Sequence, residues 1–405
     1  MAAGPRSADP RDAVFVAAAR TPIGKFGGSL SGLSAIDLGA RVIAEVVARA
    51  AVDPATVDQV IMGTVIAAGL GQVPARQAAF RAGLPVNVNA LTVNKVCASS
   101  LKAVNLAALM IRAGEADVVV AGGMESMSQA PYLLKGGRFG LRLGDGELVD
   151  SMQEDGLRCP EGKVLMADYG SEVAAEYEVS RDAQDQWALR SQQRYAAALD
   201  AGRFSHEIVG VEIPQRRGDP VTVTADEQPR PGTTMEGLAA LQPVHAGGSI
   251  TPGNAPGIND GASAILMMSR SRAEHLGLEP MGTWRAQGES AEPVKYLATV
   301  PASALRAALG KLGMDPSDLD LLEINEAFAA VAITSSNLLG VDPGRVNVNG
   351  GAVAVGHPIG ASGARILMTL LYELRRRGGG MGAATICSGM AQGEATVVEV
   401  AGSPV

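Results

Sequence analysis

Residues 51–62 read AVDPATVDQVIM, and residues 313–324, GMDPSDLDLLEI, repeat their pattern. Both stretches contain Asp-Pro, then a hydrophobic residue followed by Asp, and then a short apolar run. The sequence VNVN also occurs twice, at residues 86–89 and 346–349, with nearly the same offset of about 260 residues. A near-constant offset across separate segments indicates an internal duplication, and this duplication decides the fold class.

Both copies show the same order of five predicted elements: a helix, an apolar strand, a helix, a further helix and a buried strand. The Val-Asn-Val-Asn turn lies between the third and the fourth element. In the first copy we expect these elements at residues 34–50, 57–65, 74–82, 99–113 and 117–122. In the second copy we expect them at residues 301–313, 319–324, 327–339, 360–377 and 382–387. Ser34 with Asp37 resembles a capping box at the first helix. Helices that alternate with continuously apolar strands predict α/β layers with parallel-rich sheets.

Residues 125–255 have no counterpart in the other copy. They contain Gly- and Pro-rich loops and a polar stretch at 181–201 that is typical of a helix. We expect an inserted, mostly surface domain, and loops held on a rigid scaffold often carry substrate contacts.

The composition excludes some broad classes of function. The chain has 405 residues, 34 Lys+Arg and 42 Asp+Glu, and its net charge of −8 argues against a general nucleic-acid binder. Hydrophobic residues make up 47% and charged residues 19%, which favours a folded chain over a disordered one. The length fits two or three domains.

Cysteine and histidine are sparse. Cys97, Cys159 and Cys387 do not form a disulfide framework, and the four histidines form no pair with zinc-ligand spacing. Residues 1–11 are polar and lack the apolar core of a signal peptide, so we expect a frayed tail. We find no apolar stretch long enough for a membrane span. These features predict a cytoplasmic protein without a metal site or a membrane partner.

Cys97 and His357 are separated by the same offset as the two copies of the repeat, so they occupy equivalent positions in the two halves. Both residues come just before a predicted helix rich in small residues, where a helix N-terminus favours a thiolate and lowers the pKa of a cysteine. If equivalent turns of the two halves meet, the pair forms an activated nucleophile. Cys387 ends the last buried strand and is followed by Gly389, whose backbone could approach a substrate oxygen. Each residue also has a purely structural interpretation, because an isolated cysteine is usually a small buried hydrophobe.

Several longer motifs point to one family. Residues 93–102 read VNKVCASSLK, residues 325–329 read NEAFA, and residues 350–365 read GGAVAVGHPIGASGAR. Supporting segments are ARTPIG at 19–24, PARQAA at 74–79, GGMESMS at 122–128 and GINDGA at 257–262. From about residue 13 to its end, the chain resembles the thiolases.

The resemblance implies a duplicated five-layer α/β/α/β/α fold with an inserted loop domain. The N-terminal half would comprise residues 1–124 and a closing segment, 256–276. The insertion would be residues 125–255, and residues 277–405 would form the C-terminal half. The resemblance also implies a homotetramer (a dimer of dimers) or a homodimer.

The implied reaction is a two-step acyl transfer of acetyl-CoA type. Cys97, activated by His357, would attack acetyl-CoA and release CoA. Cys387 would then remove a methyl proton from a second acetyl-CoA, whose enolate would attack the acetyl-cysteine and give acetoacetyl-CoA. CoA thioesters are substrates here, and no cofactor or metal is implied.

The resemblance assigns further residues to oxyanion and CoA binding. One oxyanion site would use His357 and a water held by Asn325, and the other would use the backbone N–H groups of Cys97 and Gly389. The residues expected to contact CoA are Arg230, Leu241, Ala327 and Phe328. Asn325 could instead cap a helix, and Arg230 could be a solvated surface residue.

Several positions depart from the family pattern. Ala391 replaces the second glycine of the last motif, CSGMAQG at 387–393, and we expect this small change to keep the N–H positions. Pro256 and Gly237 stand where serines are common, and His245 stands where an aromatic residue is usual near the adenine. The loops 166–172 (MADYGSE) and 295–301 (KYLATVP) lack the usual His-Met-Gly and Met-Gly-x-Gly-Pro, so chain-length preference is open.

Three alternatives accompany this interpretation. A 3-ketoacyl-CoA thiolase of broader chain length belongs to the same class. A non-catalytic acyl-CoA-binding partner would typically have lost a reactive residue. This chain keeps the four expected ones, which are Cys97, Asn325, His357 and Cys387. A nicotinamide or nucleotide enzyme is disfavoured because no Gly-x-Gly-x-x-Gly turn or phosphate loop is present.

Overall fold

A computed structural model describes residues 9–402. The first half of the fold contains β1 (Ala13–Arg20), β2 (Gly24–Lys25), α1 (Ala35–Arg49), β3 (Gln59–Gly63), α2 (Pro74–Arg81), β4 (Asn89–Val93), α3 (Ser99–Ala113), β5 (Val118–Ser126), β10 (Asn259–Ser269) and α7 (Arg270–His275). The second half contains β11 (Gly282–Ala291), α8 (Val300–Gly310), β12 (Leu321–Ile324), α9 (Ala329–Leu339), α10 (Ala352–Val355), α11 (Ser362–Arg376), β13 (Gly380–Ser388) and β14 (Gln392–Val400).

The two halves have the same strand order, as the duplication predicts. In the first half the order is β4-β3-β5-β10-β1, and in the second it is β12-β13-β14-β11. Val346 forms a parallel bridge to Leu322 of β12 and so takes the place that β4 has beside β3. In both halves the first strands are parallel, as in β3–β5 and β12–β13, and the pairs that follow are antiparallel. The prediction of parallel-rich sheets is therefore wrong, because antiparallel pairs outnumber parallel ones in the large sheet. The halves join where β1 pairs with β11.

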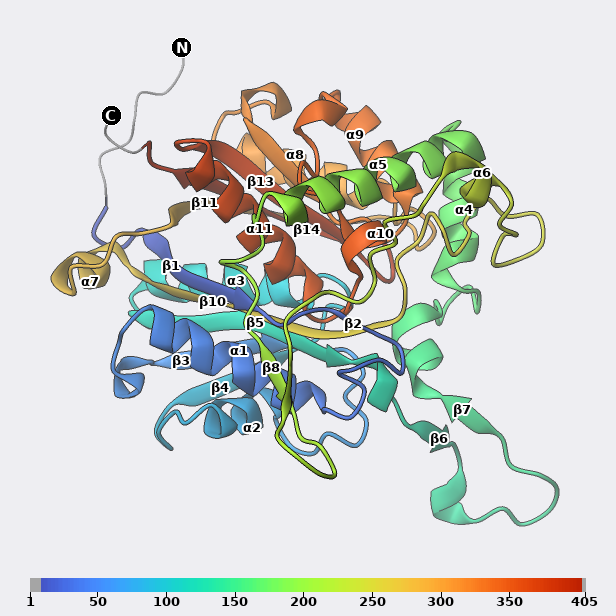
Figure 1. Ribbon diagram of the computed structural model, residues 1–405, viewed down its shortest axis with the longest axis horizontal. Helices are drawn as coiled ribbons and strands as arrows, with labels where there is room; N and C mark the ends of the chain where they lie inside the picture. Colours follow the sequence, from blue (N-terminus) through green and yellow to red (C-terminus); the bar gives the residue numbers. More distant parts are fainter. Residues whose placement is uncertain (1–8, 403–405) are drawn as a thin grey trace.

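Helices and sheet form five layers, which confirms the predicted fold class (Figure 1). α1 and α2 cover the outer face of the first half-sheet, and α8 and α9 cover that of the second. α3 and α11 lie between the two half-sheets, where α3 contacts α11. The loops that precede these two central helices are therefore brought together at the middle of the molecule.

The described elements lie close to the predicted ones. Ser34 caps α1, with both hydrogen bonds of the capping box present. β5 is longer than predicted and runs to Ser126, because residues 123–126 continue its pairing with β10. Most of the predicted tail, residues 1–8, lies outside the described residues. Arg11 is anchored, since its guanidinium donates to Asp117 and to the carbonyl of Ala116.

One helix among the described residues meets the length and composition of a membrane span, although no apolar stretch of that length was expected from the sequence. The segment Val96–Ala113 is long and apolar enough to cross a membrane by length and composition alone. Most of it is α3, whose Leu101, Val104 and Ile111 are fully buried against the half-sheets and α11. Its apolar character therefore follows from its place in the central helical layer.

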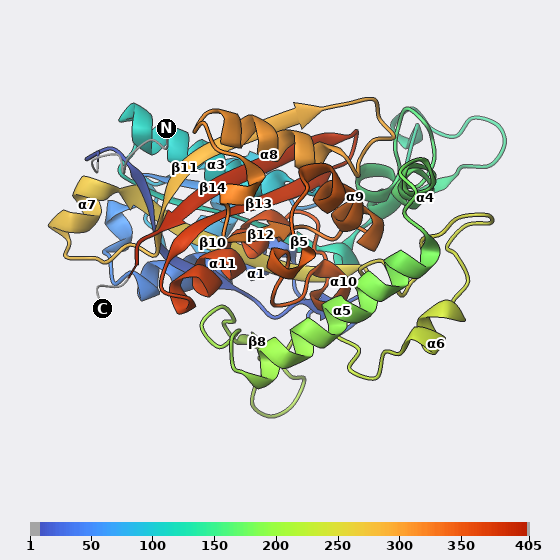
Figure 2. The ribbon, with the colours of Figure 1, turned by 90° about the horizontal axis from the view of Figure 1, so that it is seen from above.

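The segment between β5 and β10 carries short elements and one long helix. These are β6 (Tyr132–Leu134), β7 (Leu148–Asp150), a π-helical turn at Met152–Leu157, α4 (Met166–Glu176), α5 (Arg181–Asp200), β8 (Val211–Ile213), β9 (Val221–Val223) and α6 (Met235–Ala239). β6 and β7 form an arm that projects from the body (Figure 1). Figure 2 shows α5 lying along one side of the molecule, next to α10.

Candidate active site

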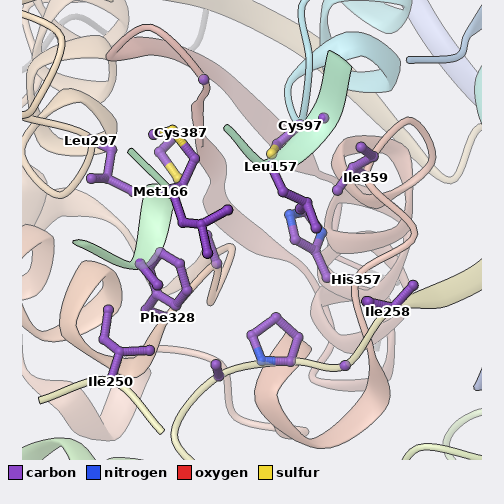
Figure 3. Close-up of a pocket in the computed structure, with 18 of the residues that line it drawn as sticks. Cys97, Leu157, Met166, Ile250, Ile258, Leu297, Phe328, His357, Ile359 and Cys387 are labelled. Atoms are coloured by element: carbon purple, nitrogen blue, oxygen red, sulfur yellow. The ribbon is translucent and has the colours of Figure 1, made fainter. Parts of the chain in front are cut away.

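A cavity of about 250 Å³ lies where loops from both halves and from the inserted segment meet. Cys97, His357 and Cys387 all line it, although 260 residues or more separate the first from the other two along the chain. Gly389, Ala327 and Phe328 line it as well. Figure 3 shows the Cys97 sulfur above the His357 ring, with Cys387 across the cavity from them. The structure thus brings together most of the predicted site residues.

Cys97 lies in the loop between β4 and α3. Burial raises the pKa of its thiol to about 12, although the backbone N–H groups of Cys97 and Gly389 oppose this rise. The predicted lowering of this pKa by the helix N-terminus is therefore wrong. Desolvation of the thiolate raises the pKa by more than the two backbone N–H groups lower it, and the negative charge of nearby Glu125 raises it further. Cys97 is a neutral thiol at rest and needs a base.

His357 precedes α11 and is held by three neighbours. Its backbone N–H donates to Asn259 Oδ1 at 2.8 Å. Its Nδ1 lies 2.6 Å from Ser362 Oγ, and its Nε2 lies 3.5 Å from Asn325 Nδ2. Burial, helped by the charge of Arg365, lowers the pKa of the imidazole to about 3. The ring is therefore neutral, and one of its nitrogens carries a lone pair.

Asn325 follows β12 and is not among the residues that line the cavity, but its side chain contacts His357, which does line it. Its backbone N–H donates to Thr385 O at 3.0 Å, which fixes it beside β13. α9 has Phe328 as its N-cap, without a side-chain cap bond, so Asn325 does not cap this helix. The buried Oδ1 of Asn325 has no hydrogen-bond partner among residues 9–402. Such an atom is costly unless a water or a ligand reaches it.

The neighbouring Glu326 has a structural role. Its carboxylate accepts hydrogen bonds from Trp187 Nε1 and Ser191 Oγ of α5, both at 2.8 Å. It also accepts from Asn347 Nδ2 at 2.9 Å and from the backbone of Val353 at 3.0 Å. One buried carboxylate thus joins helix α5 of the inserted segment to the second half, at the residue that directly follows Asn325.

Cys387 lies near the end of β13. Burial and the charge of a nearby Cys97 thiolate raise the pKa of its thiol well above the ordinary value. Ser388 Oγ donates to the carbonyl of Lys95, which ties this strand end to the loop of Cys97. Ala391 has φ +47°, a left-handed conformation that glycine adopts without strain. The replacement of the family's glycine therefore keeps the turn at some cost in stability.

Two predicted CoA contacts lie outside the cavity lining. Arg230 is exposed, and its Nη1 donates to the carbonyl of Pro252 at 3.0 Å. Leu241 packs on Leu238 in a separate small cluster. Both residues border the segment that leads into Ala255–Gly257 of the cavity wall.

Sequence reasoning missed much of the apolar wall. These lining residues come from several loops: Met127, Leu157, Leu165, Val244, Ile250, Ile258 and Ile359. Most belong to the inserted segment, where no repeat or periodic pattern marks them. Met166 and Leu297, which also line the cavity, lie in the two segments that depart from the family pattern. The first of these, residues 166–172, was expected to be a loop and instead forms the start of α4.

Comparisons with known proteins agree along nearly the whole chain. The sequence model described as "Thiolase, N-terminal domain" matches residues 13–271, and "Thiolase, C-terminal domain" matches residues 278–400. An acetyl-CoA acetyltransferase of Cupriavidus necator is 50% identical over 389 residues, 96% of this chain and 99% of the relative. One from Pseudomonas aeruginosa is 50% identical over 386 residues, 95% of this chain and 98% of the relative.

A probable acetyl-CoA acetyltransferase of Mycolicibacterium smegmatis is 48% identical, over 95% of this chain and all of the relative. The matches cover both halves, the inserted segment and every loop that lines the cavity. The chain therefore belongs to the thiolase family.

Proposed function

We propose that this protein catalyses the reversible Claisen condensation of two acetyl-CoA molecules to acetoacetyl-CoA and CoA, through an acetyl group carried on Cys97. The observation that carries the proposal is the meeting of Cys97, His357 and Cys387 on one apolar cavity. The names of the relatives support the acetyl substrate. The CoA thioesters are substrates, and the reaction needs no cofactor or metal.

In the first half-reaction, His357 Nε2 takes the proton of Cys97 as the sulfur attacks the thioester carbonyl. The backbone N–H groups of Cys97 and Gly389, which interact with the Cys97 sulfur, would stabilise an oxyanion beside it. CoA leaves as a thiolate and takes the proton of the Cys387 thiol. The products are acetyl-Cys97, protonated His357, the Cys387 thiolate and free CoA.

In the second half-reaction, the Cys387 thiolate removes a methyl proton from a second acetyl-CoA. The resulting enolate oxygen is stabilised by His357 and by a water on Asn325, whose Oδ1 has no protein partner among the described residues. The enolate carbon attacks acetyl-Cys97 and expels the Cys97 thiolate, which takes its proton back from His357. Both thiols and the neutral imidazole are then restored.

The direct test is an assay of condensation. The purified protein is incubated with acetyl-CoA, and free thiol and acetoacetyl-CoA are measured together. We expect the two products in equal amounts, and none from the Cys97→Ala variant. Binding of acetyl-CoA without release of CoA would contradict the proposal and favour a non-catalytic partner.

Chain-length preference is tested in the reverse direction. Ala327 and Phe328 border the acyl cavity, which is small and almost wholly apolar. We expect acetoacetyl-CoA to be cleaved faster than 3-ketoacyl-CoA substrates of increasing length, at saturating CoA. Faster cleavage of the longer substrates would replace the acetyl assignment with a broader 3-ketoacyl-CoA thiolase.

For the whole protein, we propose a cytoplasmic homotetramer built as a dimer of dimers. The β6–β7 arm carries Phe139 and Leu143, which are 83% and 99% exposed, and Leu91 of the edge strand β4 is 45% exposed. Apolar side chains this exposed favour contact with other copies. Free active-site thiols fit a reducing compartment. The net charge of −8 gives no support for nucleic-acid binding.

We also propose that the chain divides as its sequence suggests. Residues 1–124 and 256–276 would form one half, residues 125–255 the inserted segment, and residues 277–405 the other half. Arg230 and Leu241 would contact the outer part of CoA, since both lie next to residues 252–253, which lead into the cavity wall at Ala255–Gly257.

A further inference from the structure

Ser362 is the first residue of α11 and is fully buried beside His357. Its Oγ lies 2.6 Å from His357 Nδ1 and 2.9 Å from the carbonyl oxygen of Pro358. A serine hydroxyl has one hydrogen, so it donates to only one of these neighbours at a time. Which neighbour receives it decides which nitrogen of the imidazole carries the hydrogen.

The carbonyl of Pro358 can only accept. If the hydroxyl hydrogen pointed at Nδ1, two oxygen lone pairs would face each other across 2.9 Å without a hydrogen between them. If the hydrogen points at Pro358 O, the serine oxygen is free to accept from an Nδ1–H. The second arrangement satisfies both contacts, and it places the lone pair of the neutral ring on Nε2.

We propose that Ser362 is a positioning residue that holds His357 in the Nδ1–H tautomer and so leaves Nε2 to take the proton of Cys97. The inference rests on the proposed function. The same bond persists when Nε2 is protonated, because Nδ1–H donates to Ser362 in the imidazolium as well. His357 therefore acts as base and then as oxyanion donor without turning its ring.

The state of the resting enzyme can be observed without turnover. Nitrogen NMR of the wild-type protein labelled with ¹⁵N-histidine reports on only four histidines, and the His357→Asn variant identifies the signals of His357. We expect a protonated, pyrrole-type Nδ1 and a bare, pyridine-type Nε2. The reverse pattern would overturn the inference while leaving the proposed reaction untouched.

Rates of acetyl transfer to Cys97 supply the second readout. We expect Ser362→Ala to slow single-turnover acetylation roughly ten- to a hundredfold, as part of what a general base contributes, with little change in KM. Ser362→Thr, which keeps the hydroxyl, should recover part of the rate. The loss of Nδ1–H preference in Ser362→Ala should appear in the same NMR signals.

Ser336 of α9 is the matched control. It is also buried, and its Oγ donates to the carbonyl four residues earlier, that of Ala332, at 2.7 Å. Ser336→Ala should acetylate at the wild-type rate. If Ser362→Ala behaves like Ser336→Ala while the wild type acetylates normally, Ser362 has no positioning role. If the wild type fails to acetylate, it is the proposed function that fails.

Discussion

At the residue scale, the site holds a neutral thiol beside a neutral imidazole. Burial raises the pKa of Cys97 to about 12 and lowers that of His357 to about 3. An ion pair between them is therefore disfavoured in the empty site. Proton transfer becomes favourable only together with attack on the thioester, when the sulfur becomes bonded to carbon instead of holding a buried negative charge.

Loss of the second thiol should separate the two half-reactions. Cys387→Ala removes the proposed base of the condensation step and the proton donor to the departing CoA, but not the nucleophile. Acetylation can still proceed, with protonated His357 supplying that proton. We expect the variant to acquire an acetyl group on Cys97, yet to form acetoacetyl-CoA at least about a hundredfold more slowly than the wild type, the lower end of what a general base contributes. Mass spectrometry and the condensation assay on the same sample measure both. Normal condensation by this variant would remove Cys387 from the mechanism.

The buried histidine should also make stability depend on pH. Between its unfolded pKa near 6.5 and its folded pKa of about 3, the unfolded chain binds the proton more readily, so stability falls as the pH falls. From pH 7.5 to 5.5 this single group should cost about 1.4 kcal/mol. Urea unfolding of the wild type and of His357→Asn should differ in pH dependence by that amount. Equal pH dependence in both proteins would show that His357 binds a proton as readily in the folded state as in the unfolded chain.

The reactive residues could be predicted because they lie on the duplication. Cys97 and His357 are related by the repeat offset, and Cys387 ends a strand that both copies possess. The pKa of Cys97 could not be predicted. The sequence indicates the helix N-terminus, which lowers this pKa, but it does not show how deeply the thiol is buried, which raises it. The contact of Ser362 with His357 depends on the ring orientation, which the motif leaves open.

At the element scale, the His357 loop of the second half packs directly on β5 of the first. Glu125 of β5 accepts hydrogen bonds from the backbone N–H of Gly360 at 2.9 Å and from that of Val65 at 3.0 Å. The approach requires glycine at position 123, because a Cβ there would lie 1.9 Å from the Gly360 carbonyl oxygen. The two halves thus fix each other's catalytic loops.

Adding a methyl group at this contact should disturb both stability and chemistry. Gly123→Ala should reduce the free energy of unfolding by about 1–3 kcal/mol, because backbone rather than a flexible side chain must move. Acetylation of Cys97 should slow as the His357 loop shifts. The control is Gly310→Ala, since a Cβ at that position meets no atom of residues 9–402 within 4 Å. Equal stability of the two variants would contradict the close packing of β5 on the loop.

Elements that repeat were predictable only in part. Helix α3 begins and ends at the predicted residues, Ser99 and Ala113, and the other predicted elements differ by a few residues at their ends. The strands β1, β4, β10, β11 and β14 were not predicted, although β1 and β10 correspond to β11 and β14 of the other half. The inserted segment was not predictable at this level. Leu157 and Leu165 reach the cavity from a π-helical turn and a loop, and neither has the periodic pattern that marks a helix or strand.

At the scale of the whole molecule, an arm with exposed apolar side chains projects from the body, and residues 9–402 leave those side chains uncovered. Phe139 and Leu143 are the most exposed large apolar side chains of the arm. The proposed tetramer would bury them, since isolated two-stranded hairpins are marginally stable in water. The cavity lies in the body, at the junction of the two halves.

Assembly should therefore depend on the arm more than acetylation does. Replacing Phe139 and Leu143 together by Asp should reduce the mass measured by analytical ultracentrifugation from that of a tetramer to that of a dimer. Cys97 of the variant should still accept an acetyl group. An unchanged mass would show that the arm is not an assembly surface.

The central claim is that Cys97 carries the acyl group. The most direct measurement is mass spectrometry of the full-length protein after brief mixing with acetyl-CoA, followed by mapping of the modified peptide. We predict one acetyl group per chain, on Cys97, absent in Cys97→Ala and removed when free CoA is added. No adduct in the wild type, or an adduct on Cys159 or Cys387 instead, would contradict this account.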